Sequence, residues 1–579
     1  MPQQRQCNKT EFLIAKRQIQ PPTENLLTNR TYDFARLPDV TRTPIALLVL
    51  LVFCVLAYLP GISTIPPLDR DEPRFTQASR QMLDTGDYVD IRFQEEARHK
   101  KPVGIYWLQS VVVGLIGGDR SLIWKYRLVS FLGAILAVLL TFWTARAFLA
   151  PESAFFAALL FAATILIGVE AHIAKTDAAL LAVIVLAQGI LARIWAEPSP
   201  RGRGFVAMFW LCLGLGILIK GPIVFLVCGG TLAALCLWDR DLRWLKRLNP
   251  VSGVPLMLLI AMPWYVLIGF TTDGAFYHEA IGKDFLGKIA SGQESHGAPP
   301  GVHTAVMLAT FWPASAFLLA TLPNIRRTLG HPGVKFALCW AVPTWLVFEL
   351  TATKLPHYVL PVFPALAILT LLLMDETARR PSKPWLLRLA ALILALAPLV
   401  IAVASVAVPR FLNGPIVWPA VIVLAGAAGI AAMAAHCLLK QAYPKSMTLA
   451  ATTSVLISFG AYGLALPQLS PLWISSQIVA AAKRGSACAD PQIVSVGWRE
   501  PSLVFLAGTD TALKTAESAL EEAGRDGCAV FAIERPHDEA FGATAARQGI
   551  RLAPIGAVEG FTLNGGDAVH ITLYQKTGP

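Results

Sequence analysis

The sequence predicts a polytopic α-helical membrane protein with a small soluble α/β domain at its C-terminal end. Of its 579 residues, 55% are hydrophobic and only 15% are charged, whereas a soluble globular chain has about 25% charged residues. Apolar runs recur between residues 45 and 467, at the length of about 20 residues that a bilayer crossing requires. Beyond residue 467, short β-branched and aromatic segments replace them.

Residues 1–44 form a polar N-terminal tail, which we expect to be cytoplasmic. Four acidic residues are outnumbered there by Arg5, Lys9, Lys16, Arg17, Arg30, Arg36 and Arg42, and basic residues concentrate on the cytoplasmic side of membrane proteins. The same rule explains the net charge of +11 better than nucleic-acid binding does. No nucleic-acid-reading motif is present, so we expect no nucleic-acid partner.

The apolar runs predict thirteen transmembrane helices between residues 45 and 467. We expect these spans at residues 45–62, 121–147, 152–171, 177–196, 205–220, 221–238, 253–270, 303–323, 334–351, 356–374, 385–408, 416–439 and 447–467.

One further apolar run, residues 103–118, is short and follows Lys-Pro, so we interpret it as an interfacial or re-entrant helix. Basic pairs such as Arg326 and Arg327 then fall in cytoplasmic loops, which agrees with the positive-inside rule. This topology makes 63–120 and 271–303 outer loops. An odd number of spans also places residues 468–579 outside.

Residues 468–579 are predicted to fold as an α/β domain. Residues 492–497, 502–508, 528–534 and 568–576 are typical of strands, and residues 511–525 and 538–549 of helices. Cys488 and Cys528 each precede a predicted strand in a compartment that permits disulfides. We predict that they pair, the alternative being two free thiols in a small core.

Polar residues of five segments gather on the predicted outer face. The motifs are LDRDEPRF and RHKKPVGIYW in the first loop, EAHIAKTDA, LIKGP, and TKLPHYVLP. Ionisable groups at membrane depth are costly and are therefore functional candidates. Individually, Lys220 and Lys354 could instead snorkel to the interface, and Asp71 or Asp177 could cap a helix. Histidines of the 271–303 loop, including His296, could be ordinary loop residues.

Together these groups favour an enzyme over a transporter. Lysines at a membrane surface suit the phosphate of a lipid-linked substrate, and carboxylates suit a general base that activates a hydroxyl. A transporter more often places polar groups near the bilayer midplane, where these spans have few.

The motifs DEPRFTQASRQMLDTGD, KKPVGIYW, Thr176-Asp177 and TKLPHYVLPVFPALAIL resemble the polytopic GT-C glycosyltransferases. The resemblance covers residues 45–375 and is nearest to bacterial members related to the lipid A aminoarabinose transferase and the protein mannosyltransferases. It implies the GT-C fold and the inverting transfer of one sugar from a polyprenyl-phosphate donor to a lipid or glycan acceptor. It also implies a multi-pass protein of the bacterial inner membrane that acts at the periplasmic face as a monomer.

The resemblance assigns roles to individual residues. Asp71 and Asp177 match the family's two outer-loop carboxylates and are the expected catalytic residues. Lys101 and Lys220 match residues that hold the carrier phosphate, and Lys354 is a third candidate. The remaining expected substrate-binding residues are Glu72, Arg74, Lys100, His296, His357 and Tyr358.

Lys100 departs from the family pattern. Relatives of the lipid A transferase have a glutamate directly before the Lys-Pro and can bind a divalent metal through it, so we carry over no metal site and expect no certain cofactor. The double lysine leads us to expect an anionic group here, such as a uronic acid or a lipid phosphate. Protein O-mannosylation, a lipid-linked sugar flippase and a non-catalytic scaffold remain alternatives.

Overall fold

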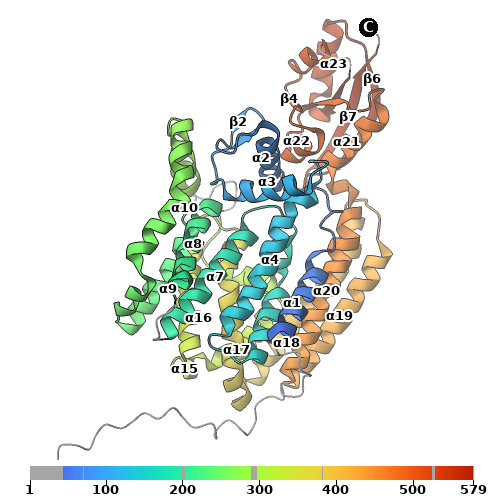
Figure 1. The fold of residues 1–579 in the computed structure, drawn as a ribbon. Coiled ribbons are helices and arrows are strands. Elements are labelled where there is room, and N and C mark those ends of the chain that lie inside the picture. Colours follow the sequence, from blue (N-terminus) through green and yellow to red (C-terminus); the bar gives the residue numbers. More distant parts are fainter. Residues whose placement is uncertain are drawn as a thin grey trace, which may run out of the picture.

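The computed structural model describes residues 43–68, 71–197, 202–287, 297–380, 382–524 and 528–577. It consists of a helical bundle and a C-terminal α/β domain at one end of that bundle (Figure 1). The expected cytoplasmic tail, residues 1–44, lies almost entirely outside these ranges.

The first half of the bundle holds ten α-helices and one two-stranded hairpin. They are α1 (Thr43–Tyr58), α2 (Asp71–Thr85), β1 (Arg92–Phe93), β2 (Glu96–Ala97), α3 (Gly104–Ile116), α4 (Ile123–Ala145), α5 (Pro151–Ala162), α6 (Ile165–Ala171), α7 (Asp177–Ala196), α8 (Arg203–Lys220), α9 (Ile223–Asp239) and α10 (Pro250–Thr271).

The second half continues through helices of several types to residue 472. They are α11 (Ala275–Tyr277), the π-helix η4 (His278–Leu286), α13 (Val302–Thr310), α14 (Ala314–Thr321), α15 (Ile325–Thr328), α16 (Pro332–Leu350), the 3-10 helix η6 (Pro356–Val362), α17 (Phe363–Arg379), α18 (Pro384–Phe411), α19 (Trp418–Leu439), α20 (Tyr443–Ile457) and the π-helix η7 (Ser458–Ala465). Short 3-10 segments lie at Arg243–Leu248, Leu322–Asn324, Leu466–Gln468 and Ser470–Leu472.

Within the described residues, nine helices are long and apolar enough to cross a membrane, or eleven when two bent pairs are each counted as one span. The bent pairs are α5 with α6 and α13 with α14–α15. The other two of the thirteen expected spans correspond to the shorter apolar helices α1 and α9. The described residues therefore contain nine to eleven candidate membrane spans, and thirteen remains a prediction.

Helix α3 has 13 residues and runs across the end of the bundle beside α2 (Figure 1). At 1.5 Å per residue it is about 20 Å long, too short for a hydrocarbon core of about 30 Å. This length supports the interpretation of residues 103–118 as a helix that does not cross.

The C-terminal domain contains a five-stranded mixed sheet in the order β4-β3-β5-β7-β6. Its elements are α21 (Ile474–Gly485), β3 (Gln492–Val496), α22 (Pro501–Ala507), β4 (Ala512–Lys514), a 3-10 turn (Ala519–Gly524), β5 (Ala529–Glu534), a 3-10 turn (Arg535–His537), α23 (Asp538–Arg547), β6 (Leu552–Phe561) and β7 (Ala568–Lys576). Strand β3 is parallel to β4 and β5, whereas β7 is antiparallel to β5 and β6. Cys488 and Cys528 are joined by a disulfide, as expected.

Two secondary-structure predictions in this domain are wrong. Residues 502–507 lie in helix α22 rather than in a strand. Pro501 occupies the first turn of this helix and Gly508 is its C-cap, and a short apolar run fits either structure. Within the predicted helix 511–525, residues 512–514 form strand β4 and residues 519–524 form a 3-10 turn. Strand β6 was not predicted.

The C-terminal domain docks on the outer-loop segment of the bundle. Gln77 on α2 donates a hydrogen bond to Thr509, and Arg80 donates to the Phe505 carbonyl. Gln94 adds bonds to the carbonyls of Thr509 and Thr511. Helix α2 therefore lies between the bundle and the C-terminal domain.

Candidate active site

A cavity of about 540 Å³ lies where α2, the loop before α3, α7, α8 and η6 meet. Its polar wall contains residues from all five outer-face motifs. These include Asp71, Arg74, Lys100, Lys101, Asp177, Lys220, His357 and Tyr358. Its apolar wall comes from α8, α9 and α16, with Ile217, Ile223, Phe225, Leu226, Val347 and Phe348. Five predicted segments thus converge on one chamber.

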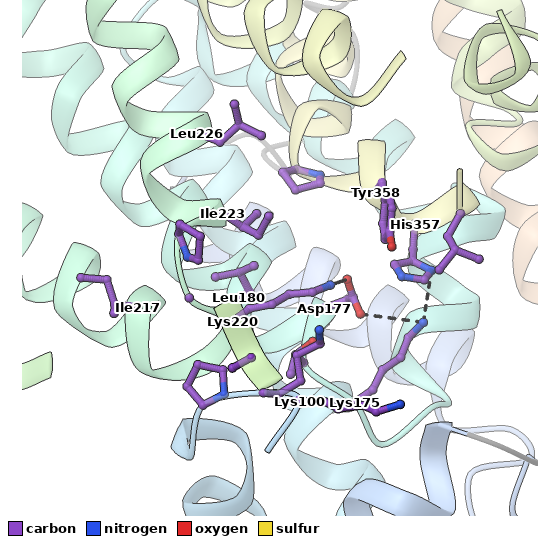
Figure 2. A pocket seen from close by; sticks show the side chains of 18 of the residues that line it. Lys100, Lys175, Asp177, Leu180, Ile217, Lys220, Ile223, Leu226, His357 and Tyr358 are labelled. Carbon is purple, nitrogen blue, oxygen red and sulfur yellow. Dashed lines mark hydrogen bonds and ion pairs between the residues drawn. The ribbon is translucent and has the colours of Figure 1, made fainter. Parts of the chain in front are cut away.

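Asp177 is the centre of a charged network in this cavity. Figure 2 shows its carboxylate between the ammonium groups of Lys220 and Lys175, at 2.5 Å and 3.8 Å. Lys175 lies 3.0 Å from the Glu170 carboxylate and 3.4 Å from Nδ1 of His357. Asp177 is only 8% exposed, and a buried carboxylate of this kind requires such cationic partners.

Two glycines allow the backbones around this network to approach closely. A Cβ atom at Gly133 on α4 would lie 2.9 Å from the backbone of Ala178, the residue after Asp177. A Cβ atom at Gly104 on α3 would lie 2.7 Å from the backbone of Leu218, two residues before Lys220. Real Cβ atoms do not come this near, so glycine is required at both places. Close packing thereby positions the ends of α7 and α8.

The start of α7 differs from one of the sequence interpretations. Asp177 is the first residue of the helix and Thr176 is its N-cap, and no side-chain capping hydrogen bond is formed. The Asp177 carboxylate instead points to the lysines (Figure 2). Capping of α7 is therefore not the role of Asp177.

Asp71 and Glu72, although adjacent, have different environments. Asp71 is exposed and lines the cavity. Glu72 is buried and forms a bidentate ion pair with Arg127 through two 2.8 Å contacts. It also accepts hydrogen bonds from the backbone N–H groups of Leu68 and Ala174. Both oxygens of Glu72 are thus engaged in holding the loops together, and its expected role in substrate binding stays a prediction.

Lys354 is likewise placed away from the cavity wall. Its Nζ donates hydrogen bonds to the carbonyl oxygens of Glu349 and Thr351 at the C-terminal end of α16. Cations at this end of a helix satisfy its last carbonyls and complement its dipole. In this structure Lys354 therefore caps the end of α16, and its expected role as a phosphate ligand stays a prediction. His296 lies outside the described residues.

Two charged residues of the cavity wall, Lys175 and Arg98, were not among the predicted site residues, nor was Glu170, which pairs with Lys175. Lys175 lies in the motif EAHIAKTDA. Its position two residues before Asp177 could have identified it as a candidate site residue. Glu170 is the sole acid in the apolar sequence ILIGVEA, which marks a costly and therefore noteworthy position. Arg98 precedes the recognised Lys-Lys-Pro, and no sequence pattern distinguished it from a surface arginine.

The electrostatics of the network keep Lys175 charged. Burial alone would lower the pKa of Lys175, but the nearby carboxylates of Glu170 and Asp177 outweigh that effect and raise it above its usual value. Asp71 acts in the same direction, so its carboxylate is close enough to be felt by this ammonium group. The cavity therefore presents a permanent cation beside two carboxylates.

The residues present do not fit the divalent metal known in the family. At the position where relatives have glutamate this cavity has the Lys100 ammonium, which repels a cation. Across the described ranges, no group of three or more His, Cys, Asp or Glu side chains has the arrangement of a metal site. No step is therefore assigned to a metal.

This bundle and its cation-rich cavity define a polytopic membrane protein of the GT-C fold. The crystal structure of ArnT from Cupriavidus metallidurans bound to undecaprenyl phosphate superposes with a TM-score of 0.72 at 19% identity, covering 92% of this chain and 98% of that one. The apo form of the same protein gives 0.70 at 20% identity, covering 91% and 97%.

Sequence comparisons identify related proteins over part of the chain. Residues 100–267 match the family model for dolichyl-phosphate-mannose-protein mannosyltransferase. The undecaprenyl phosphate-alpha-4-amino-4-deoxy-L-arabinose arabinosyl transferase of Erwinia tasmaniensis is 27% identical over 324 residues, 55% of this chain and 57% of that protein. Enzyme 2 of the same name from Pseudomonas fluorescens is 28% identical over 333 residues, 56% and 58%. The expected resemblance to GT-C glycosyltransferases is confirmed, with a match to somewhat over half of these relatives' length.

Proposed function

We propose that this protein transfers a single sugar from a polyprenyl-phosphate carrier to a lipid acceptor of the bacterial envelope. The observation that carries the proposal is the chamber itself, in which Asp71, Asp177, Lys101, Lys175 and Lys220 converge beside an apolar wall. Cations and a hydrocarbon surface together suit a lipid phosphate. The similarity to enzymes that use undecaprenyl phosphate supports the same carrier class.

The apolar wall is suited to the prenyl chain of the donor. Ile223, Phe225 and Leu226 belong to the first turn of α9, and Ile217 lies on α8. Lys220 lies between these two groups along the chain, at the end of α8. A carrier whose hydrocarbon lies along α8 and α9 would therefore place its phosphate near Lys220, with Lys101 and Lys175 as further partners.

The reaction is an inverting displacement at the anomeric carbon. The acceptor oxygen forms a bond to that carbon while the bond from carbon to the phosphate oxygen breaks, and the electron pair leaves with polyprenyl phosphate. The lysines stabilise the second negative charge that develops on this leaving group. Asp71, the exposed carboxylate, takes the proton of a hydroxyl acceptor. An acceptor that is itself a phosphate is already anionic and needs this base less.

The position of the chamber and of the basic loops supports a reaction at the periplasmic face. The chamber lies at the end of the bundle that carries α2, α3 and the C-terminal domain (Figure 1). Basic loop residues such as Arg326 and Arg327 lie on α15 at the opposite end. Under the positive-inside rule this distribution of basic residues supports a cytoplasmic N-terminus and a periplasmic C-terminus.

Mass spectrometry of envelope lipids and periplasmic proteins tests the proposal. The samples are cells with the wild-type gene, with a deletion, and with Asp71→Asn at matched protein level. We expect one lipid to lose the mass of one sugar in both mutants, and that mass identifies the sugar. Loss of hexoses from proteins, with intact lipids, would instead establish protein O-mannosylation. Accumulation of an unmodified carrier-linked sugar with neither loss would indicate a flippase.

A further inference from the structure

Glu170 is a buried carboxylate directly behind the cavity wall. It lies on α6, in the otherwise apolar sequence ILIGVEA, and is only 2% exposed. It does not line the cavity, and its charged partner is the wall residue Lys175, at 3.0 Å. Its second oxygen, Oε2, is buried and has no hydrogen-bond partner among the described residues. The charge of Glu170 is therefore balanced mainly by a lysine that belongs to the chamber.

The stability of the fold does not account for this carboxylate. A buried ion pair costs so much desolvation that apolar residues of similar volume are often equally or more stabilising. The buried pair of Glu72 and Arg127 has a structural explanation, because further hydrogen bonds from both partners tie several loops together. In the part of the chain that the structure describes, Glu170 makes no such bonds. Its effect on Lys175 is therefore the feature that needs an explanation.

Lys175 is shared between Glu170 and the chamber. Its ammonium group lies 3.0 Å from Glu170, 3.8 Å from Asp177 and 3.4 Å from Nδ1 of His357. Asp177 has a closer cation in Lys220, at 2.5 Å. Figure 2 shows the Lys175 ammonium group beside Asp177 and His357, although its shortest ion pair is with the carboxylate behind the wall. The flexible lysine stem allows this group to move from Glu170 toward an anion in the chamber.

The proposed reaction changes the charge that Lys175 meets. A polyprenyl phosphosugar is a phosphodiester with a single negative charge, whereas the released polyprenyl phosphate is a monoester with nearly two charges at neutral pH. Attraction to the lysines grows with that charge, so the chamber holds the released carrier more tightly than the donor phosphate. A carboxylate that competes for one of the lysines opposes this tight binding. Glu170 is placed to compete for Lys175.

We propose that Glu170 is a positioning residue that draws Lys175 back from the carrier phosphate and thereby limits the affinity of the chamber for the released carrier. The step breaks no covalent bond, because the ammonium group only exchanges the phosphate for the Glu170 carboxylate. The inference rests on the proposed function, since it gives Glu170 a part in the release of that reaction's leaving group.

Equilibrium binding to the full-length protein in nanodiscs tests the proposal. One probe is undecaprenyl phosphate, a dianion at about pH 8 because its second phosphate pKa is about 6. The other is its methyl ester, a monoanion with the phosphate charge of the donor. The variants are Glu170→Gln, Glu170→Asp, Lys175→Gln and the double variant of Glu170→Gln with Lys175→Gln. Glu152→Gln is the matched control, an acid in the first turn of α5 at the other end of the same bent helix pair.

We expect Glu170→Gln to bind undecaprenyl phosphate about tenfold more tightly than wild type, the size of one hydrogen bond between charged groups, with a smaller gain for the methyl ester. Lys175→Gln should bind undecaprenyl phosphate more weakly than wild type, and the double variant should bind it like Lys175→Gln. Glu152→Gln should match wild type. Partial unfolding does not tighten binding, so a merely structural role of Glu170 would not imitate this result.

Glu170→Asp keeps the decision open if Glu170→Gln fails to fold. The shorter side chain retains the charge but withdraws it from Lys175 by one methylene. We therefore expect Glu170→Asp to bind undecaprenyl phosphate more tightly than wild type, by a smaller factor than Glu170→Gln.

Three results would overturn the inference: an affinity for undecaprenyl phosphate that is unchanged or lower in both Glu170 variants, an equal gain for the monoester and the methyl ester, or a gain of the same size in the double variant. The last result would mean that Glu170 acts on the phosphate directly and not through Lys175. Failure of wild type to bind either probe would overturn the proposed function as well, whereas wild-type binding that Glu170 does not affect would overturn this inference alone.

Discussion

Phe505 of the C-terminal domain packs edge-on against Tyr126 of the membrane bundle, with ring centroids 5.5 Å apart and ring planes at 81°. Both side chains are fully buried, in a cluster that also contains Val113, Ile123 and Ala174. Ala174 directly precedes Lys175 and donates its backbone N–H to Glu72. The C-terminal domain therefore contacts the segment that supplies a lysine to the cavity.

This contact predicts that Phe505→Ala impairs the transfer reaction from a distance. Truncation of a buried phenylalanine costs about 3–5 kcal/mol, and here the cost falls on the junction between the domain and the 172–176 segment. We expect a lower melting temperature and reduced transfer at equal protein level, with partial rescue by Phe505→Leu. Phe561→Ala, at the partly exposed end of β6, serves as the control. Equal activity losses in both variants would show that the Phe505 contact has no special role.

Substitutions at the adjacent residues Asp71 and Glu72 should affect different properties, the first the transfer activity and the second the stability of the protein. Asp71→Asn removes an exposed carboxylate, so we expect lost transfer with a melting temperature near that of wild type. Glu72→Gln breaks the buried pair with Arg127, and loss of one partner of such a pair costs about 3–5 kcal/mol. Thermal denaturation and transfer assays on both variants check this. A stable Glu72→Gln protein that fails to bind undecaprenyl phosphate would support the substrate-binding role.

Lys354→Gln should weaken the end of α16 without changing donor binding. The variant loses two charge-assisted bonds to the carbonyls of Glu349 and Thr351, for which we expect about 1 kcal/mol of destabilisation. Affinity for undecaprenyl phosphate should be unchanged, whereas Lys220→Gln should reduce it. A reduction of similar size in Lys354→Gln would mean that this lysine reaches the carrier after all.

Titration of Lys175 itself should not contribute to the pH dependence of the unfolding free energy in the neutral range. The pKa of this group is raised in the folded state, so its ion pairs contribute fully to stability below the unfolded value of about 10.4. That contribution is lost only as the pH rises through the higher folded value. We therefore expect the difference in unfolding free energy between wild type and Lys175→Gln not to shrink from pH 6 to 9 (~3 units). A difference that shrinks between pH 7 and 9 would contradict the charged network.

Much of the bundle is predictable from the sequence because a membrane span is a local property. Each apolar run identifies its own helix without knowledge of partners, and the alternation of spans then brings Asp177, Lys220 and His357 to one face. The roles of Asp71 and Glu72 depend instead on the direction in which each side chain points. Adjacent residues on a helix are about 100° apart, so Asp71 faces the cavity while Glu72 turns to Arg127, and no local pattern decides which of the two does so.

Other features depend on the three-dimensional arrangement of the chain. Lys354 donates to carbonyls at the end of α16 and does not line the cavity, and this follows from how α16 ends. The Nε atom of Arg98 is buried without a hydrogen-bond partner, which only the three-dimensional structure can reveal. In the C-terminal domain, residues 502–508 are apolar enough for a buried strand, but α22 forms there and provides Phe505 for the interface.

The bridge between Cys488 and Cys528 gives the chain an internal reporter of its orientation. The six free cysteines of the described residues are buried or half-buried, and a disulfide persists only where cytosolic thiols cannot reduce it. A thiol-reactive polymer added to denatured cells, after free thiols have been blocked, would therefore shift the protein on a gel only after chemical reduction. The oxidation state of these two cysteines would therefore indicate on which side of the membrane the last 100 or so residues lie.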